Sequence, residues 1–264
     1  MVDIGANLAH KSFRADLDEV LARARRAGVG RIIITGTSVD ASEDALELAR
    51  RHGLWSTAGV HPHEAKRLDA HALGRLRVLA REPEVVALGE CGLDFERNFS
   101  PPTEQLRAFE AELELAAELG MPVFMHERRA HADFLRIVQR HRASLARGVV
   151  HCFTGSGAEL EAYLGLDLHI GITGWICDER RGAHLHDAVS KIPPDRLMLE
   201  SDAPFLLPRT LRPKPKTRRN EPAFLPAVLD AVAKALGRSS AQVARETTET
   251  ALAFFGIQRR KGPG

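Results

Sequence analysis

The chain has 264 residues, of which 44% are hydrophobic and 27% charged, and these ordinary globular proportions exclude a disordered or fibrous chain. Its 37 Lys and Arg against 35 Asp and Glu leave a net charge of +2, so charge alone neither favours nor excludes a polyanionic partner. Aromatic residues make up only 5%, which argues against a protein that binds mainly by stacking bases on aromatic side chains.

The sequence shows no sign of membrane insertion or secretion. No apolar run reaches the roughly 18 residues of a membrane span, and residues 1–10 lack the basic and apolar regions of a signal peptide. The three cysteines, Cys91, Cys152 and Cys177, form no CxxC pair, which is typical of reduced thiols. We therefore expect a cytoplasmic protein that does not bind membranes, and we expect a monomer.

Short apolar runs alternate along the chain with stretches of helical periodicity. Several runs are continuous and rich in β-branched residues, which is typical of parallel strands buried on both faces. The predicted strands span residues 2–5, 32–35, 54–59, 85–88, 122–125, 148–151, 168–173 and 196–200.

The stretches between these strands carry helical patterns and helix-end signals. Residues 17–24 place apolar side chains at the spacing of one helical face. Asp40, with an acidic residue three positions on, predicts a helix start, and Gly53 lies just past the predicted end. A further apolar stripe over residues 106–116 is ended by Gly120.

Eight strand-then-helix units over this length predict an α/β fold, a single (β/α)8 TIM barrel. We expect this barrel to span residues 1–257, with residues 258–264 as a frayed basic tail. An open, doubly wound sheet is the alternative. It usually carries a Gly-rich phosphate loop after the first strand, and residues 5–8, Gly-Ala-Asn-Leu, are not such a loop.

In a TIM barrel the chemistry lies at the carboxyl ends of the strands. Imidazoles or carboxylates follow five of the predicted strands, at positions that include His61, His63, Glu90, His126, His151 and Asp202. A single histidine after an apolar run is more often an ordinary core or surface residue, but five such strand ends together are harder to explain that way. The histidines within helical stretches are interpreted as solvated or helix-end residues.

Imidazole nitrogens and carboxylate oxygens are ligands of divalent metals. Glu90, His126 and His151 therefore predict a three-ligand metal site with positions left open for water. An open site suits hydrolysis, because a metal lowers the pKa of bound water. Asp202 would bind a second metal or act as general base on that water; the alternative is that it only caps the following turn.

Seven motifs occur in barrel-like order: GVHPH (59–63), GECGLDF (89–95), PVFMH (122–126), HCFTG (151–155), GITGW (171–175), ESDAP (200–204) and RRNEP (218–222). Together they resemble the TatD family of metal-dependent deoxyribonucleases, and the resemblance runs from residue 2 to about residue 256. The opening DIGANLAH and the segment CDERRG (177–182) are most similar to the branch from which that family takes its name.

The resemblance implies an amidohydrolase-type barrel that hydrolyses DNA phosphodiesters with Mg2+, acting as a 3′-to-5′ exonuclease on single-stranded DNA, with RNA as a further substrate and a role in DNA repair or degradation. By match of motif, Glu90, His126 and His151 would hold the main metal, with Glu90 bridging to a second. His61 and His63 would contact the scissile phosphate or assist the leaving group. Mn2+ and Zn2+ are alternative metals.

Two departures from the family pattern stand out. Many relatives carry His-x-His after the first strand, where this chain has Asn7 and Ala9. We therefore expect one firmly held metal and a second held weakly through Glu90, Asp202 and substrate phosphate. The family often shows Cys-Arg-Asp after the fifth strand, where residues 127–129 are Glu-Arg-Arg, which exchanges a carboxylate for a guanidinium near the mouth.

A basic segment follows the last predicted strand and contains no acid: Arg209, Arg212, Lys214, Lys216, Arg218 and Arg219. Arg180 and Arg181 follow the seventh strand and would add to the same rim. Such cations would contact nucleic-acid phosphates without reading sequence; the alternative is a solvated loop. Trp175 and Phe205 would each stack one base or pack beneath this loop.

Three other functions remain open. The first is a small-molecule amidohydrolase or esterase on the same barrel, and the second is a deacylase of aminoacylated tRNA. The basic segment separates a nuclease from a hydrolase of neutral amides, which needs no cationic rim. The third is a nucleic-acid binder that has lost its metal, and the retention of Glu90, His126, His151 and Asp202 argues against it.

Overall fold

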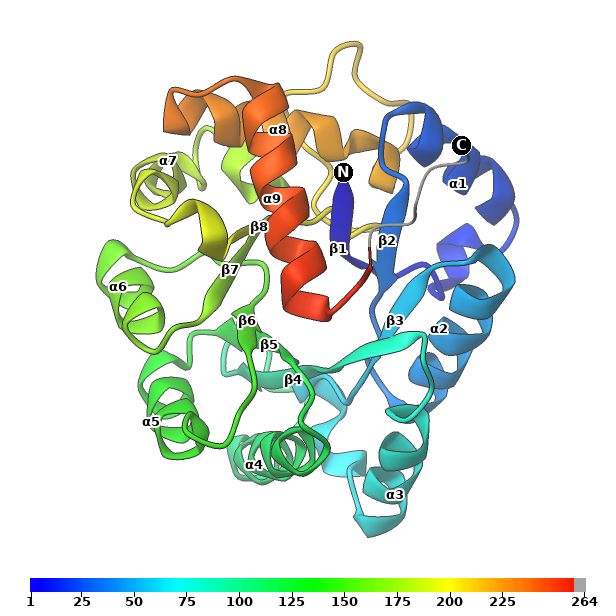
Figure 1. Ribbon diagram of the computed structural model, residues 1–264, viewed down its shortest axis with the longest axis vertical. Coiled ribbons are helices and arrows are strands. Elements are labelled where there is room, and N and C mark those ends of the chain that lie inside the picture. The colour runs from blue at the N-terminus through cyan, green and yellow to red at the C-terminus, as the bar shows by residue number, and fades with distance from the viewer. Residues whose placement is uncertain (259–264) are drawn as a thin grey trace.

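The computed structural model describes residues 1–258 and contains one eight-stranded parallel sheet. Its strands are β1 (Val2–Ala6), β2 (Arg31–Ile34), β3 (Trp55–Ala58), β4 (Val85–Asp94), β5 (Val123–Arg128), β6 (Gly148–Val150), β7 (His169–Ile172) and β8 (Leu197–Leu199). Their order in the sheet is their order in the chain. A parallel bridge between Ala6 and Ala203 brings the first strand beside the segment after the last. The sheet therefore closes, which confirms the predicted barrel and excludes the open alternative (Figure 1).

Eight helices follow the strands in turn and surround the barrel (Figure 1). They are α1 (Leu17–Arg26), α2 (Val39–His52), α3 (Ala70–Leu79), α4 (Pro102–Leu119), α5 (His131–His141), α6 (Gly157–Gly165), α7 (Ala183–Ser190) and α8 (Leu225–Leu236). The predicted helix ends at Gly53 and Gly120 are confirmed, since both adopt the left-handed conformation. The helix start expected at Asp40 is at Val39 instead, because the Ser38 side chain accepts the Ala41 N–H.

Strand β4 is longer than the sequence predicts and continues through Gly89 and Gly92 to Asp94. Both glycines have positive φ angles, of 126° and 134°. A Cβ on Gly89 would lie 2.1 Å from the Phe124 carbonyl oxygen, and one on Gly92 would lie 2.0 Å from the His126 carbonyl oxygen. These glycines let β4 lie close to β5, so Glu90 is held within a strand rather than in a loop.

A ninth helix, α9 (Ser240–Phe255), covers the amino-terminal end of the barrel (Figure 1). Its Ala251, Phe254 and Phe255 belong to the same buried cluster as strand residues such as Ile33 and Phe124. Burial of these apolar side chains closes the end of the barrel opposite the one where chemistry is expected.

None of the helices in residues 1–258 is long and apolar enough to span a membrane. The three cysteines are free. The predicted frayed tail, residues 258–264, lies outside the described residues except for Gln258.

Candidate metal centre

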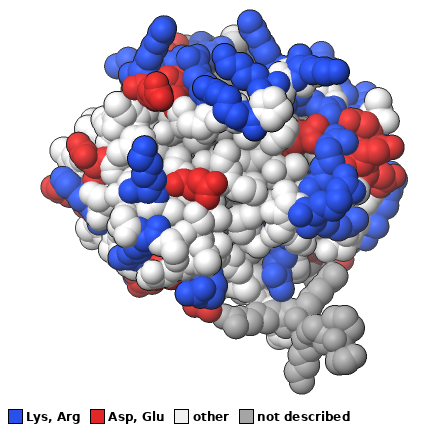
Figure 2. All heavy atoms as spheres, turned by 90° about the horizontal axis from the view of Figure 1, so that it is seen from above, with Lys and Arg blue, Asp and Glu red and all other residues white. Residues whose placement is uncertain are grey.

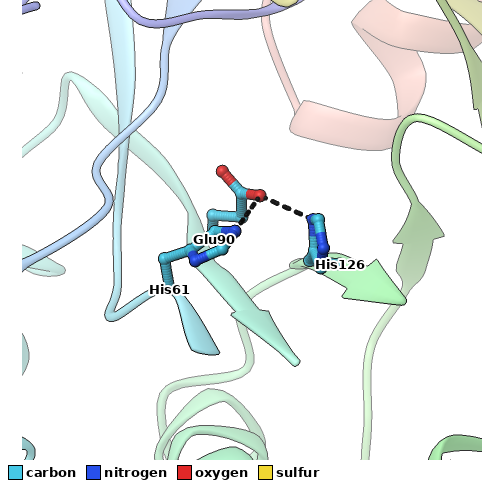
Figure 3. Close-up of side chains that lie close together, drawn as sticks. All are labelled: His61, Glu90 and His126. Carbon is cyan, nitrogen blue, oxygen red and sulfur yellow. Dashed lines mark ion pairs between the residues drawn. The ribbon is translucent and has the colours of Figure 1, made fainter. Parts of the chain in front are cut away.

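One carboxylate oxygen lies among three imidazoles at the carboxyl end of the barrel. Oε1 of Glu90, in β4, is 2.8 Å from Nε2 of His151, 3.0 Å from Nδ1 of His126 and 3.3 Å from Nε2 of His61. Figure 3 shows the Glu90 carboxylate directed toward the rings of His61 and His126. The structure thus brings together the three predicted ligands and places His61, predicted as a phosphate contact, beside them.

These residues fit a divalent metal ion. The ligand atoms of His61, Glu90 and His126 all lie within 4.8 Å of one another, and their donor types are those of zinc and related metals. Nδ1 of His126 is the ring nitrogen that faces the cluster and lies 3.2 Å from Nε2 of His151, whereas its Nε2 faces Oδ2 of Asp94 at 3.7 Å. Two imidazole nitrogens and a carboxylate oxygen that converge in this way form a donor set that a divalent cation can join.

The four side chains shift one another's protonation. Burial opposes ionisation of Glu90, but His151, His61 and His126 hold its pKa well below the usual value. Burial also works against the charged form of His151, yet the Glu90 and Glu200 carboxylates raise its pKa well above the ordinary value. For His61 burial prevails and lowers the pKa to about 4. The cluster therefore contains an ionised carboxylate and a neutral His61 ring, both of which are forms that bind metals.

Asp202 follows β8, which lies four strands along the ring from the β4 strand of Glu90, and it interacts electrostatically with His151 and Glu90. Its backbone N–H donates to the Gly5 carbonyl (2.9 Å), and its Oδ1 accepts a hydrogen bond from Nδ2 of Asn7 (3.1 Å). Burial, together with Glu90 and Glu200, raises the pKa of Asp202 to about 8; a bound cation would lower it. Within residues 1–258 its carboxylate bonds to Asn7 and not to the backbone of the following turn.

His63 lies beside the cluster, with its ring centre 4.2 Å from that of His61, and a buried carboxylate orients it. Its Nε2 is 2.9 Å from Oδ2 of Asp94, at the end of β4. The other Asp94 oxygen accepts backbone N–H groups from Glu96 and Arg97. Burial opposes ionisation, but His126 and His63 hold the pKa of Asp94 well below its usual range. Asp94 therefore fixes the ring of His63 at the mouth.

The sequence pattern of the family described as "TatD related DNase" matches residues 2–256. The chain belongs to this family.

Individual relatives cover nearly all of the chain. It is 54% identical over 259 residues to the "3'-5' ssDNA/RNA exonuclease TatD" of Erwinia amylovora, a match that covers 97% of this chain and 100% of that protein. The protein of the same name from Klebsiella pneumoniae is 51% identical over 258 residues, covering 97% of this chain and 98% of that one.

Solved structures show the same barrel. A TatD family hydrolase from Entamoeba histolytica superposes with a TM-score of 0.89 at 27% identity, over 98% of both chains. The TatD homolog YJJV from Escherichia coli gives a TM-score of 0.88 at 28% identity, again over 98% of both chains.

In this TatD family member the predicted basic rim divides into three groups. Arg180, Arg209 and Arg212 line a cavity of about 260 Å³ between the segments after β7 and β8. Asp178 at its edge pairs with Arg181 and Arg209, both at 3.2 Å. Figure 2 shows Lys and Arg side chains gathered along the upper edge of the face that it views. This group offers cations to a solvent-exposed cavity.

The second group is already paired within the protein. Arg219 binds Asp16 at 2.6 Å and Glu221 at 2.8 Å, and its guanidinium lies 5.1 Å from the centre of the Phe13 ring. It joins the segment after β8 to the start of α1. Arg181 lies over Trp175, at 4.8 Å from the ring centre, so the Trp175 ring packs against a side chain of the rim. By contrast, Lys214, Lys216 and Arg218 are exposed.

The carboxyl end of β5, where the chain departs from the family pattern, is tied into the fold. One oxygen of Glu127 accepts the Ala130 N–H at 2.7 Å, and the other accepts the Tyr163 hydroxyl at 3.1 Å. Arg128 pairs with Glu96 at 2.6 Å. The first two residues of this departure therefore have structural partners.

Two further supporting carboxylates, like Asp94, were not predicted as site residues. Glu200, fully buried, lies 3.3 Å from Nδ1 of His151 and also accepts the Cys152 N–H. A Cβ on Gly5 or Gly171 would lie 2.7 or 2.6 Å from its oxygens, so these glycines make room for it. Glu112 of α4 accepts the N–H of Val60 at 2.8 Å. Each supports a histidine of the cluster from behind.

Proposed function

We propose that this chain is a metal-dependent exonuclease that hydrolyses single-stranded DNA, and also RNA, from the 3′ end. The observation that carries this proposal is the Glu90 carboxylate oxygen within 3.3 Å of three imidazoles at the mouth of a TatD family barrel. The names of relatives about half identical in sequence point to the same substrates. As the family resemblance implies, this activity would serve DNA repair or degradation.

Glu90, His126 and His151 would hold the cation, and His61 lies close enough to join them. We propose Mg2+ as the metal, with Mn2+ and Zn2+ as alternatives. When bound there, the cation supplies Lewis-acid catalysis and lowers the pKa of water. Glu200 keeps the His151 ring in place by accepting from its other nitrogen.

Side chains of the protein would accept and donate the protons of the reaction. Asp202 would accept the proton of the attacking water as general base, because its carboxylate interacts electrostatically with Glu90 and His151 of the cluster. His63, partly exposed and oriented by Asp94, would steady the phosphate or protonate the leaving oxygen. The His61 ring lies 4.2 Å from the His63 ring and would contact the phosphate beside it.

A second cation would be held weakly. The positions where many relatives carry His-x-His are Asn7 and Ala9, and Asn7 is bonded to Asp202. A second ion would therefore depend on Glu90, Asp202 and substrate phosphate for its ligands. One firmly bound metal per chain is the expected stoichiometry.

Arg212, Lys214, Lys216 and Arg218, together with Arg180 and Arg181, would contact the phosphates of the bound strand. The cavity beside Arg180 and Arg212 supports this proposal, since three arginines line it against two acids, Asp178 and Glu179. A polyanion explains such a rim better than the neutral substrate of a small-molecule amidohydrolase. We also propose that the protein acts as a monomer in the cytoplasm, in keeping with its free cysteines.

End-labelled single-stranded and double-stranded DNA and RNA test the proposal, each incubated with Mg2+, Mn2+ or Zn2+. We expect metal-dependent, stepwise shortening of single strands from the 3′ end, and slow or no digestion of duplexes. Internal cleavage without end shortening, or no hydrolysis of any nucleic acid alongside cleavage of small esters or aminoacylated tRNA, would contradict it.

A further inference from the structure

Three large hydrophobic side chains are strongly exposed among residues 1–258: Val78, Phe99 and Phe205, with exposed fractions of 62%, 59% and 50%. Val78 lies on α3, but the two phenylalanines follow strands at the carboxyl end of the barrel. Phe99 comes after β4 and Phe205 after β8. These strands are four places apart in a closed ring of eight, so the two rings stand on opposite sides of the mouth.

Phe99 stands against a residue of the candidate site. The centre of its ring is 4.7 Å from that of His63, and the two planes are at 89°. The next residue, Ser100, is buried and donates from its hydroxyl to the His63 carbonyl at 2.8 Å. The backbone is thus fixed directly after an exposed aromatic ring.

Phe205 has a matching arrangement on the other side. Its ring centre is 5.8 Å from that of His10, with the planes at 67°, and Nδ1 of His10 is held by Ser12 at 2.9 Å. The Phe205 N–H donates to the Asp202 carbonyl at 2.9 Å. The position of this ring is therefore coupled to that of the proposed general base.

We infer that Phe99 and Phe205 are stacking sites for two unpaired bases, one on each side of the scissile phosphate. This inference rests on the proposed function and deepens it. The penultimate base of a duplex has both faces covered by its neighbours and cannot stack on a side chain, so a pair of rings that takes both the terminal and the penultimate base selects single strands. Stacking of this kind accepts every base, because every base has a π face.

The distribution of charge orients the strand. The segment after β8, residues 209–219, carries six cations and no acid, whereas near Phe99 one acid, Glu96, and one cation, Arg97, precede it and Lys66 donates to its carbonyl at 3.4 Å. The 5′ part of the strand is longer and has more phosphates than the 3′-terminal nucleotide, so it should lie on the side of the cationic segment after β8. Phe99 therefore receives the 3′-terminal base, and Phe205 receives the base that precedes it.

The test uses short single-stranded DNAs that lack one base, at either the 3′-terminal or the penultimate nucleotide. Binding to the full-length protein is measured in the presence of a chelator, so that the strand stays intact. Loss of a stacked base weakens binding about 5- to 100-fold. Phe99→Leu should bind intact DNA more weakly than the wild type by the same factor. Removal of the 3′-terminal base should then cause no further loss of affinity in this variant. Phe205→Leu should be insensitive to the missing penultimate base.

Leucine keeps an apolar side chain at each position, and Val78→Ala is the matched control, which should bind like the wild type. Exchanged responses of the two variants would overturn the orientation. Equal binding of all DNAs by all variants would overturn the stacking sites, while 3′-end digestion by the wild type would leave the proposed function intact. If the wild type does not digest DNA from the 3′ end but its affinity still depends on the two bases, the exonuclease proposal is refuted and the stacking sites are not.

Discussion

The Glu112 carboxylate and the Val60 N–H form a buried hydrogen bond of 2.8 Å directly before His61. Burial raises the pKa of Glu112 well above its usual value, so the side chain is a neutral acid that accepts one hydrogen bond. This contact fixes the backbone from which His61 and His63 reach the mouth. It links the back of the barrel wall to the candidate site without touching substrate.

Glu112→Gln should therefore be almost silent, because the amide oxygen still accepts from Val60. Glu112→Leu should cost about 1–3 kcal/mol of stability, since it leaves a buried N–H without a partner. Its turnover should fall as well, because His61 and His63 lose their support. Denaturant unfolding and single-strand digestion check both variants. Equal activity of the glutamine and leucine variants would show that the hydrogen bond does not position the histidines.

Replacement of Glu90 or His126 with alanine should abolish metal-dependent hydrolysis and leave the fold intact, because each variant removes a ligand from the cluster. Bound metal, measured by elemental analysis, should fall with activity, and circular dichroism should be unchanged. His71→Ala, an exposed histidine of α3, is the control. Near-normal metal content and activity in both site variants would refute the assignment.

Asp202→Asn should keep the shape of the side chain and its contact with Asn7 but lose the base. The rate should drop by about 10²–10⁴-fold, the usual contribution of general-base catalysis. Metal at the main site and affinity for single strands should largely persist. Turnover within a few-fold of wild type at saturating Mg2+ would mean that Asp202 is neither base nor essential ligand.

Replacement of Arg212, Lys214 and Lys216 with alanine should weaken binding similarly for all nucleic-acid sequences. The slope of log affinity against log salt should fall by about 0.7 for each lost single-strand phosphate contact. A triple variant of exposed cations elsewhere, Arg25, Arg26 and Lys234, controls for net charge. An unchanged salt slope in the first variant, or an equal change in the second, would show that the loop is only a solvated connection.

His169, at the amino-terminal end of β7, should make stability depend on pH. Burial and the nearby Arg196 lower its pKa from 6.5 to about 4 in the folded protein. The unfolded chain therefore binds the proton more readily, and the stabilisation present above pH 6.5 should be lost as the pH falls toward 4. His169→Leu should show a shallower decline in melting temperature over this window. An identical decline would assign the pH dependence to other groups.

The barrel is predictable because buried parallel strands are continuous apolar runs, and all eight predicted strands are present. The carboxyl end of β4 could not be predicted, because Gly89 and Gly92 are typical of a loop in the sequence. In the structure these two glycines allow close contact with β5. The covering position of α9 depends on tertiary packing, which periodicity does not specify.

The supporting residues of the site differ in how well the sequence predicts them. Asp94 lies four residues after Glu90, and side chains two apart on a strand share a face, so its inward orientation could have been predicted once β4 was extended. Glu200 likewise is the last residue of a predicted strand. Glu112 gives no signal, because a glutamate within an amphipathic helix has the pattern of a surface residue.

The closure between β1 and the segment after β8 joins residues nearly 200 positions apart. Asp3 accepts the Ser201 N–H at 2.8 Å, and Asn7 binds Asp202 at 3.1 Å, across 198 and 195 residues. Every histidine of the cluster precedes residue 152, so a growing chain contains these proposed ligands well before it contains Asp202. The proposed base reaches its place only when the ring is closed. The complete candidate site therefore exists only in the finished barrel, and an unfinished chain lacks the residue proposed to activate water.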